Sequence, residues 1–395
     1  MSDTAASPGG ARFEWANMLR GVASLSVVVG HFAVVFWMAQ DAGASLARRP
    51  ALYPGSTGAP AFSRALAAVP VDFGAFGVGL FFLVSGFVIA VSVDRYSRRG
   101  FVVGRLTRIL PTYAAGYLVT CGVVAVMRDP HHELGVVPVL VGCVPGLGVL
   151  LGVPTPGDGI VWTLIIELVF YVVCLVAYRR MTRGWVPVLA VAAACAGAQV
   201  GLGHLGPVTG RFWSGLSYLV ALAAPFIPLM LVGVVLSGHR RGHLRTGAVA
   251  ALVPVLVVVH TVLLRTNPVV HVGVPFHVGC LLAVVLFLLG WRTGGAWRRS
   301  RPVDALADLS YPLYVVHAVL GYAILSVLAG RGVPPVLAVL VATAAGLGAA
   351  WVLHRVVEVP THHWGRGWAR RLTPAAPVTA PERDATETAE PVAQP

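Results

Sequence analysis

Long apolar stretches dominate this chain and restrict what it can fold into. Ten of them are close to the length of about 20 residues that a helix needs to cross the hydrocarbon core of a bilayer. Hydrophobic residues make up 57% of the 395 positions and charged residues only 11%. A water-soluble domain carries far more surface charge, so the sequence predicts an all-α, multi-pass membrane protein. The predicted spans cover residues 15–38, 71–93, 109–127, 160–178, 185–203, 215–236, 246–264, 270–290, 309–329 and 335–356.

The segment 134–152 is also apolar, but Pro138, Pro145 and several glycines interrupt it. If it were an eleventh span, Arg179, Arg180 and Arg183 would lie outside, whereas a broken or re-entrant segment keeps them inside. With ten spans and both termini cytoplasmic, the inner segments carry 22 of the 29 basic residues, all of them arginine. This asymmetry is what the positive-inside rule requires.

The predicted organisation has three parts. Residues 1–12 form a cytoplasmic N-terminal tail, residues 13–360 the membrane domain, and residues 361–395, rich in Pro, Ala, Thr and Glu, a disordered cytoplasmic tail. The formal charge of +13 is explained by arginines at the inner face beside anionic lipid, so no nucleic-acid partner is indicated. We expect a multi-pass protein of the cell membrane, specifically of a bacterial plasma membrane.

The first span carries a polar stripe. Asn17, Arg20, Ser24 and His31 are spaced so that a helix turning about 100° per residue places them on one face. With Arg20 at the inner interface, His31 lies about 16 Å deeper, near the middle of the bilayer. Ionisable side chains at that depth are costly and mark functional sites. A titratable imidazole there predicts either chemistry or transport.

Two arginines stand at the cytoplasmic entrance of the third span. Arg105 and Arg108 are three residues apart and therefore neighbours on a helix surface. Such a pair can hold phosphate oxygens through bidentate hydrogen bonds. The alternative is that both are ordinary anchors at the inner membrane face, and the spacing alone favours this second interpretation.

An acidic residue lies inside the fourth span. Glu167 follows Trp162 by five residues and sits about two helical turns from the outer end of the span. A buried carboxylate there can orient an imidazole, act as a base or pair with an arginine. A structural ion pair is the alternative, although acids are rare inside spans.

The last two spans carry further candidates. Tyr314 and His317 share a helix face in the ninth span, and His317 is equally consistent with packing and with function. Glu358, with Pro360, ends the tenth span, and we expect it to pair with a cytoplasmic arginine. No histidine or cysteine group has the spacing of a metal site, so neither a metal nor a bound cofactor is expected.

Taken in order, these pieces resemble acyltransferase family 3, the polytopic membrane O-acyltransferases. The resemblance runs from about residue 13 to residue 360. Its motifs are Leu19-Arg20-Gly21-Val22-Ala23 with His31, Gly77-Val78 with Phe81-Phe82-Leu83-Val84-Ser85-Gly86-Phe87, Arg105-x-x-Arg108 before Pro111, Trp162-Thr163-Leu164 with Glu167 and Tyr171, Ser310-Tyr311 with Tyr314 and His317, and Glu358-x-Pro360.

The resemblance implies an enzyme that moves an acyl group, commonly acetyl, from cytoplasmic acyl-CoA to a hydroxyl, often of a sugar. It also implies that His31 is catalytic and that Arg105 and Arg108 serve the donor, with Arg20 as a further candidate. Members often have Asp where this chain has Asn17, which makes Glu167 the expected partner of His31. His31 would then either remove the acceptor's proton or carry the acyl group itself.

The sequence therefore predicts a membrane O-acyltransferase that uses acyl-CoA and a carbohydrate-containing acceptor. The acceptor classes are a surface polysaccharide, a lipid-linked saccharide and a macrolide-type metabolite. The competing hypothesis is a transporter or exporter of a lipid-linked sugar or small metabolite, which a midplane histidine and a broken segment would also suit. The absence of an evident inverted repeat favours the enzyme.

Overall fold

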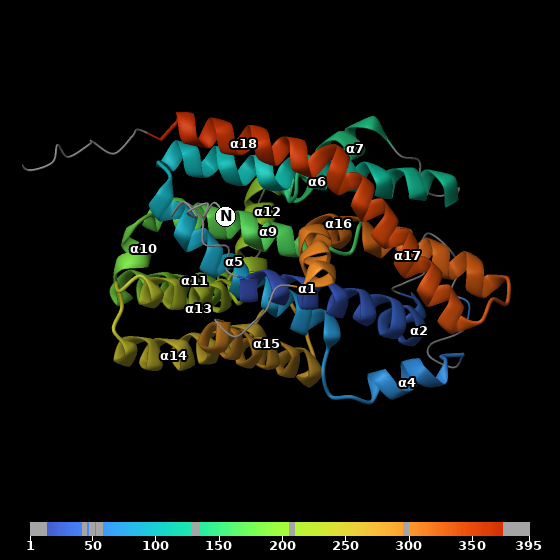
Figure 1. The fold of residues 1–395 in the computed structure, drawn as a ribbon, viewed down its shortest axis with the longest axis horizontal. Coiled ribbons are helices and arrows are strands. Elements are labelled where there is room, and N and C mark those ends of the chain that lie inside the picture. The colour runs from blue at the N-terminus through green and yellow to red at the C-terminus, as the bar shows by residue number, and fades with distance from the viewer. Residues whose placement is uncertain are drawn as a thin grey trace, which may run out of the picture.

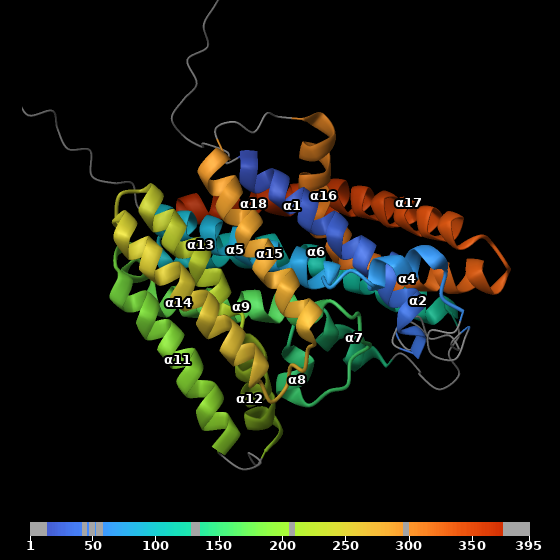
Figure 2. The same cartoon turned by 90° about the horizontal axis from the view of Figure 1, so that it is seen from below.

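A computed structural model describes residues 14–41, 46, 52, 58–127, 135–204, 210–294 and 300–373. Every regular element in these residues is a helix. Many of the helices run in broadly the same direction, as in a membrane bundle (Figures 1 and 2). The prediction of an all-α fold is confirmed for this part of the chain.

Eight helices of the described residues are long and apolar enough to cross a membrane. Two of these are continuous helices that contain a π-helical turn. The first consists of α1 (Glu14–Val29), the π-turn η1 (Gly30–Val35) and α2 (Phe36–Met38), and the last of α17 (Pro335–Leu353), the π-turn η3 (His354–Glu358) and α18 (Val359–Arg371). The other six are α5 (Phe73–Arg95), α6 (Arg98–Met127), α11 (Trp185–His204), α14 (Thr246–Arg265), α15 (Val274–Thr293) and α16 (Arg301–Gly330).

Two of the ten predicted spans take a different form. The span expected at 215–236 is a pair of helices, α12 (Arg211–Ala223) and α13 (Ile227–Arg240), bent by 53° at the break between them. Pro225 lies in the break and Pro228 opens α13. Proline has no N–H to donate and clashes with the preceding turn, which accounts for the bend.

The span expected at 160–178 is the shorter helix α9 (Val161–Ala177), of 17 residues. At about 1.5 Å per residue it is roughly 25 Å long, less than the hydrocarbon thickness of about 30 Å. It ends at Tyr178, whose φ of 39° is incompatible with a further helical turn. The short helix α10 (Arg180–Arg183) follows.

The segment 134–152 is broken, as its prolines and glycines predict. Its described part contains two short helices, α7 (Val136–Gly142) and α8 (Leu147–Leu151). Gly146 separates them with a φ of 81°, a backbone conformation that favours glycine. Its re-entrant or outward position relative to the bilayer stays a prediction.

The helices α1 and α5 form the centre of the bundle (Figure 1). The α1 helix packs against α5, α15 and α16, and α5 packs against α13 and α15. Two glycines of α5 permit this contact: a Cβ on Gly77 would lie 2.5 Å from the carbonyl oxygen of Ala23, and one on Gly86 would overlap the carbonyl oxygen of Met230. The glycines of this segment therefore serve close helix packing.

The last helix continues past the point where the sequence pattern places the start of the tail. Residues 359–371 form α18, which runs alongside α6 (Figure 1). Glu358 consequently lies inside a continuous helix and not at its end. Residues 1–12 and 374–395 lie outside the described residues.

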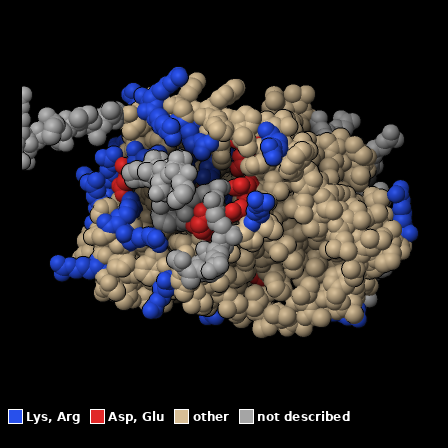
Figure 3. Space-filling model, in the orientation of Figure 1, with Lys and Arg blue, Asp and Glu red and all other residues tan. Residues whose placement is uncertain are grey.

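Cationic side chains gather at one end of the molecule. Figure 3 shows most of those on this face near α10, the start of α14 and the C-terminal end of α18, while much of the remaining surface is uncharged. The short helix α4 (Ala61–Ala67) lies toward the opposite end (Figure 1). This one-ended distribution fits the positive-inside pattern, and the assignment of the cationic end to the cytoplasm stays a prediction.

Candidate active site

A cavity of about 390 Å³ opens between α1, α5, α6, α9 and α16. We call it the arginine cavity. Its apolar lining includes Phe81 and Phe82 of α5, and charged or polar side chains face it from several helices. The predicted site residues that line it are Asn17, Arg20, Arg105, Arg108, Tyr314 and Glu167.

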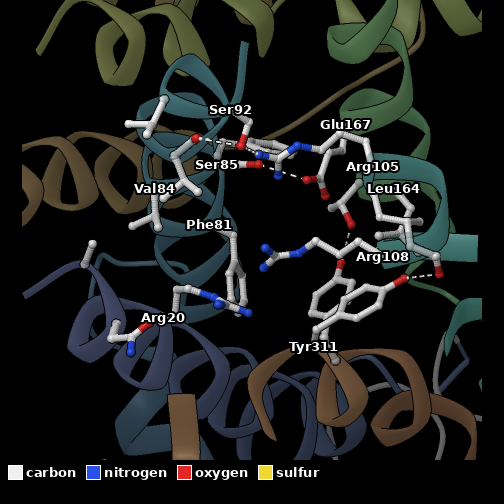
Figure 4. A pocket seen from close by; sticks show the side chains of 18 of the residues that line it. Arg20, Phe81, Val84, Ser85, Ser92, Arg105, Arg108, Leu164, Glu167 and Tyr311 are labelled. Atoms are coloured by element: carbon white, nitrogen blue, oxygen red, sulfur yellow. Dashed lines mark hydrogen bonds between the residues drawn. The ribbon is translucent and has the colours of Figure 1, made fainter. Parts of the chain in front are cut away.

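The guanidinium groups of Arg20 and Arg108 point into this cavity from different helices (Figure 4). Among the described residues, neither side chain forms an ion pair or a hydrogen bond. Each lies close enough to feel the other's charge. The carboxylates of Glu358, Glu167 and Asp308 also act on the charge of Arg20. Two guanidinium groups that face one space still favour an anion between them, because their mutual repulsion is relieved when it binds.

Arg105 is held differently from Arg108. It is buried, with 7% of its surface exposed, and donates a hydrogen bond to Ser92 (Figure 4). Its guanidinium also lies 5.8 Å from the ring centroids of both Phe101 and Tyr171. Of the predicted arginine pair, Arg108 is therefore the freer side chain, and Arg105 forms part of the wall.

Glu167 lies in the wall of the arginine cavity. Its Oε1 accepts hydrogen bonds from Ser85 Oγ at 2.9 Å and from Tyr171 Oη at 2.7 Å. The start of its helix α9 is fixed by Asp158, whose Oδ1 accepts from the backbone N–H groups of Ile160 and Val161 at 3.0 and 2.9 Å. Burial raises the pKa of Asp158 above its ordinary value. The carboxylate of Glu167 is thus hydrogen-bonded and oriented within a cationic cavity.

His31 faces a second cavity, of about 290 Å³, which we call the histidine cavity. Besides His31 its polar side chains come from Asp72 and Tyr314. Trp162 contributes to the wall, which is otherwise mostly apolar. The apolar side chains are Val27, Val34, Val35, Leu66, Val69, Val71, Phe73, Val78, Pro275 and Phe276.

His31 lies at the start of the π-turn η1, and such turns occur often at functional sites. Its Nδ1 is 3.0 Å from the hydroxyl of Tyr322, and the two rings are stacked with centroids 5.8 Å apart. The ring of His317 lies edge-on at 4.9 Å. His31 is therefore held by a tyrosine and a second histidine, both from α16.

The tautomer of His317 follows from its neighbours. Its Nδ1 lies 2.8 Å from the carbonyl oxygen of Tyr314 and 3.1 Å from that of Leu313. Carbonyl oxygens only accept hydrogen bonds, so Nδ1 carries the proton and Nε2 presents a lone pair. The side chain is fully buried, and its Nε2 has no partner among the described residues.

The two cavities meet at Val78 and Tyr314, which line both. The Tyr314 hydroxyl lies 2.7 Å from Thr163 Oγ1 and 3.3 Å from the carbonyl oxygen of Ile160, and so it is tied to the start of α9. The continuous first helix carries Arg20 in one cavity and His31 in the other, about 16 Å apart at the helical rise. Val78 and Tyr314 therefore form the boundary between the two cavities.

The structure brings some of the predicted residues together and separates others. Tyr314 and His317 do lie beside His31, and Trp162 lines the same cavity. Glu167 does not orient His31, because it lines the other cavity and binds Ser85 and Tyr171. Ser24 does not orient it either, since its Oγ donates to the carbonyl oxygen of Gly21.

Among the described residues Glu358 forms no ion pair with an arginine, although it lies close enough to Arg20 to act on its charge. Its Oε2 lies 2.7 Å from Nδ1 of His354, one turn earlier on the same helix, and the side chain is buried. The π-turn η3 keeps the helix continuous here, so there is no helix end for Glu358 to neutralise.

Tyr322 is the site residue that the sequence pattern missed. It lies five residues after His317 on α16, in a run of apolar residues with no charged neighbour to mark it. Ser85 of α5 was also missed as a partner of Glu167. The signal for both lies in which helices pack together, and a single sequence does not reveal that.

Comparison with known proteins gives one match. The model of a family described as an acyltransferase domain matches residues 13–355 of the chain. No curated protein matches, and no solved structure does. The matched region includes every residue that lines the arginine cavity or the histidine cavity.

Proposed function

Because the chain belongs to acyltransferase family 3, we propose that it is a membrane O-acyltransferase with acyl-CoA as donor and a carbohydrate-containing molecule as acceptor. The observation that carries the proposal is the pair of cavities that meet at Tyr314. One presents unpaired arginines and the other presents His31. Acetyl is the acyl group that we expect.

The arginine cavity suits the phosphorylated donor. Arg20 and Arg108 offer two guanidinium groups to a phosphate, each able to donate a bidentate hydrogen-bond pair. In this proposal the donor reaches His31 by passing Val78 and Tyr314, which line both cavities. The donor must therefore have an anionic end and a slender arm. The phosphopantetheine arm of acyl-CoA has this shape and carries the thioester at its tip.

The histidine cavity suits the acceptor. Its wall is mostly aliphatic and aromatic, with His31, Asp72 and Tyr314 as polar side chains. Sites that bind an entire polar sugar chain need many hydrogen-bond partners, because unpaired buried polar groups are costly. This supports an acceptor with a substantial apolar part, such as a lipid-linked saccharide or a macrolide-type metabolite, over a purely polar polysaccharide.

His31 acts as the general base in this proposal. For its Nε2 to accept a proton, Nδ1 must carry one and donate it to the Tyr322 oxygen. His31 then takes the proton of the acceptor hydroxyl while that oxygen attacks the thioester carbonyl. The new C–O bond forms, the C–S bond breaks, and His31 returns the proton to the departing thiolate.

The experiment is thiol release from acetyl-CoA by the purified protein in lipid vesicles, with and without glycosylated acceptors. A positioned base contributes about 10²–10⁴-fold to the rate, so His31→Ala should lose activity on that scale while staying folded. His260→Gln is the matched control, because His260 is a buried histidine that lines neither cavity.

Two results would contradict the proposal. Near-normal turnover by His31→Ala would remove His31 from the chemistry. No thiol release from any acyl-CoA by a folded wild-type protein would favour the transporter hypothesis instead. Thiol released once per protein molecule without acceptor would indicate that His31 carries the acyl group.

A further inference from the structure

A third cavity, of about 190 Å³, adjoins the arginine cavity beneath α18. Five residues line both, and two of these are the arginines of the predicted pair. The shared residues are Val88, Ser92, Tyr96, Arg105 and Arg108. The third cavity is therefore an extension of the arginine cavity, with its own wall formed by α18.

The helix α18 is fixed against α6 by close contacts. A Cβ on Gly365 would overlap Thr107 Oγ1, and one on Gly100 would lie 2.6 Å from the carbonyl oxygen of Ala369. At the end of the helix, Ser97 Oγ donates to the carbonyl oxygen of Leu372 at 2.7 Å. These contacts hold α18 against α6 beside the cavity residues, so α18 forms one wall of the cavity.

Three residues of α18 line this space, and two of them, His362 and Arg366, have basic side chains. His362 and Arg366 are one helical turn apart and line the cavity together with Arg105 and Arg108. Arg366 is exposed and forms no ion pair or hydrogen bond among the described residues. The Nε2 atom of His362 is buried and likewise lacks a partner there.

The charges that act most strongly on His362 are those of arginines. Its electrostatic neighbours are Arg108, Arg366, Arg20 and His354. The nearby acids are already engaged: Glu358 with His354, and Glu167 with Ser85 and Tyr171. Glu358, Glu167 and Asp308 act on the charge of Arg20, but no ion pair among the described residues includes Arg108 or Arg366, so the extension favours a negatively charged ligand.

We propose that the cleft between α6 and α18 binds a phosphate at the nucleotide end of the acyl-CoA donor, through Arg366 and His362. The inference rests on the proposed function and deepens it by assigning a second phosphate site outside Arg20 and Arg108. The volume of about 190 Å³ has room for phosphate groups. The cleft is continuous with the arginine cavity, where the donor's other phosphates are proposed to bind. This favours the donor over a lipid headgroup, whose binding would not require that continuity.

The test compares donors that share the thioester but differ in phosphates: acetyl-CoA, acetyl-dephospho-CoA and acetyl-pantetheine. Hydrogen bonds to charged groups are worth enough to change binding about ten-fold. Arg366→Gln should therefore raise the KM for acetyl-CoA about ten-fold relative to its KM for acetyl-pantetheine. Acetyl-dephospho-CoA lacks only the 3′-phosphate. If Arg366→Gln has no effect on the KM for this donor, the cleft binds the 3′-phosphate; if the effect persists, the cleft binds the diphosphate.

Arg370→Gln is the matched control. Arg370 lies one turn further along α18, is exposed and lines none of the cavities, so it reports the general effect of removing a surface charge. Arg366→Lys should recover part of the donor binding. A KM effect that is the same for all three donors, or no larger than that of Arg370→Gln, would overturn the proposal.

Two further outcomes are separated by design. If Arg366→Gln changes KM only in vesicles containing anionic lipid and not in purely zwitterionic ones, the cleft binds a lipid headgroup and the assignment is wrong. If the wild type turns over no donor at all, the proposed acyl transfer fails. If the wild type turns over acetyl-CoA and Arg366→Gln has the same KM for it, only the α18 site is refuted and the proposed acyl transfer stands.

Discussion

Replacing Tyr322 by phenylalanine removes the hydrogen bond between its hydroxyl and His31 Nδ1, which in the proposed mechanism keeps the proton on Nδ1. The Tyr322 hydroxyl lies 3.0 Å from His31 Nδ1, and the tyrosine side chain is almost fully buried. Its ring stacks on Phe36 at 5.9 Å and meets Phe32 edge-on at 6.4 Å. Phenylalanine keeps these ring contacts, so the substitution removes the hydroxyl and little else.

The size of the effect follows from that single bond. A neutral hydrogen bond contributes about 0.5–1.5 kcal/mol net, and this energy holds both the ring orientation and the proton on Nδ1. If the bond is needed for the reactive state, its loss lowers kcat by roughly 2- to 13-fold, since each 1.36 kcal/mol is a factor of ten. The KM for acetyl-CoA should not change, because the proposed site for the donor's phosphates lies at the other end of the first helix, at Arg20.

The assay is kcat and KM for acetyl-CoA at saturating acceptor, measured for Tyr322→Phe beside Tyr113→Phe. Tyr113 is the matched control: it is also buried, its hydroxyl makes one hydrogen bond, 3.1 Å from Asp158, and it lines neither main cavity. A kcat of Tyr322→Phe within the error of the wild type would refute the tautomer argument. So would an equal loss in Tyr113→Phe, because the effect would then reflect stability.

Glu167→Gln should lower kcat by less than about ten-fold, because Glu167 lies in the arginine cavity and not beside His31; a loss above about 10²-fold in the same thiol-release assay would return Glu167 to a catalytic role. Gly86→Ala should destabilise the protein by about 1–3 kcal/mol, since the new Cβ would overlap the backbone of Met230 and force α5 away from α13. Thermal unfolding measures this, with Gly122→Ala as the control that has open space around its Cβ; equal unfolding temperatures for the two variants would contradict the packing argument.

The features that the sequence predicted well are those that depend on one helix at a time. The polar stripe of the first span follows from helical periodicity, and it does place Asn17 and Arg20 in a shared cavity. The break in 134–152 follows from proline and glycine, whose backbone restrictions act locally. The close packing of Gly77 and Gly86 follows from the lack of a side chain at positions within an apolar helix.

The features that it missed depend on which helices meet. Glu167 and His31 were paired because both are ionisable and rare inside spans, but that argument contains no information on distance. The structure gives Glu167 two hydroxyl partners, Ser85 and Tyr171, and gives His31 the hydroxyl of Tyr322. Hydroxyl groups cost little to place in an apolar helix, so they leave no visible signal in a hydropathy pattern. The helix α18 was missed for the opposite reason, because its polar composition resembles a tail until α6 is there to pack against.

The first helix explains why the two halves of the site stay in register. Arg20 and His31 belong to one continuous helix that packs on α5, α15 and α16, so the distance between the anion site and the base is fixed by the helical rise. The π-turn at Gly30–Val35 changes the helix only around His31. There it widens the helix and turns the His31 side chain toward α16. A donor anchored at Arg20 therefore presents its thioester at a set depth. In this proposal the acyl group beyond the thioester shares the histidine cavity, of about 290 Å³, with the acceptor, which makes a short acyl group the expected one.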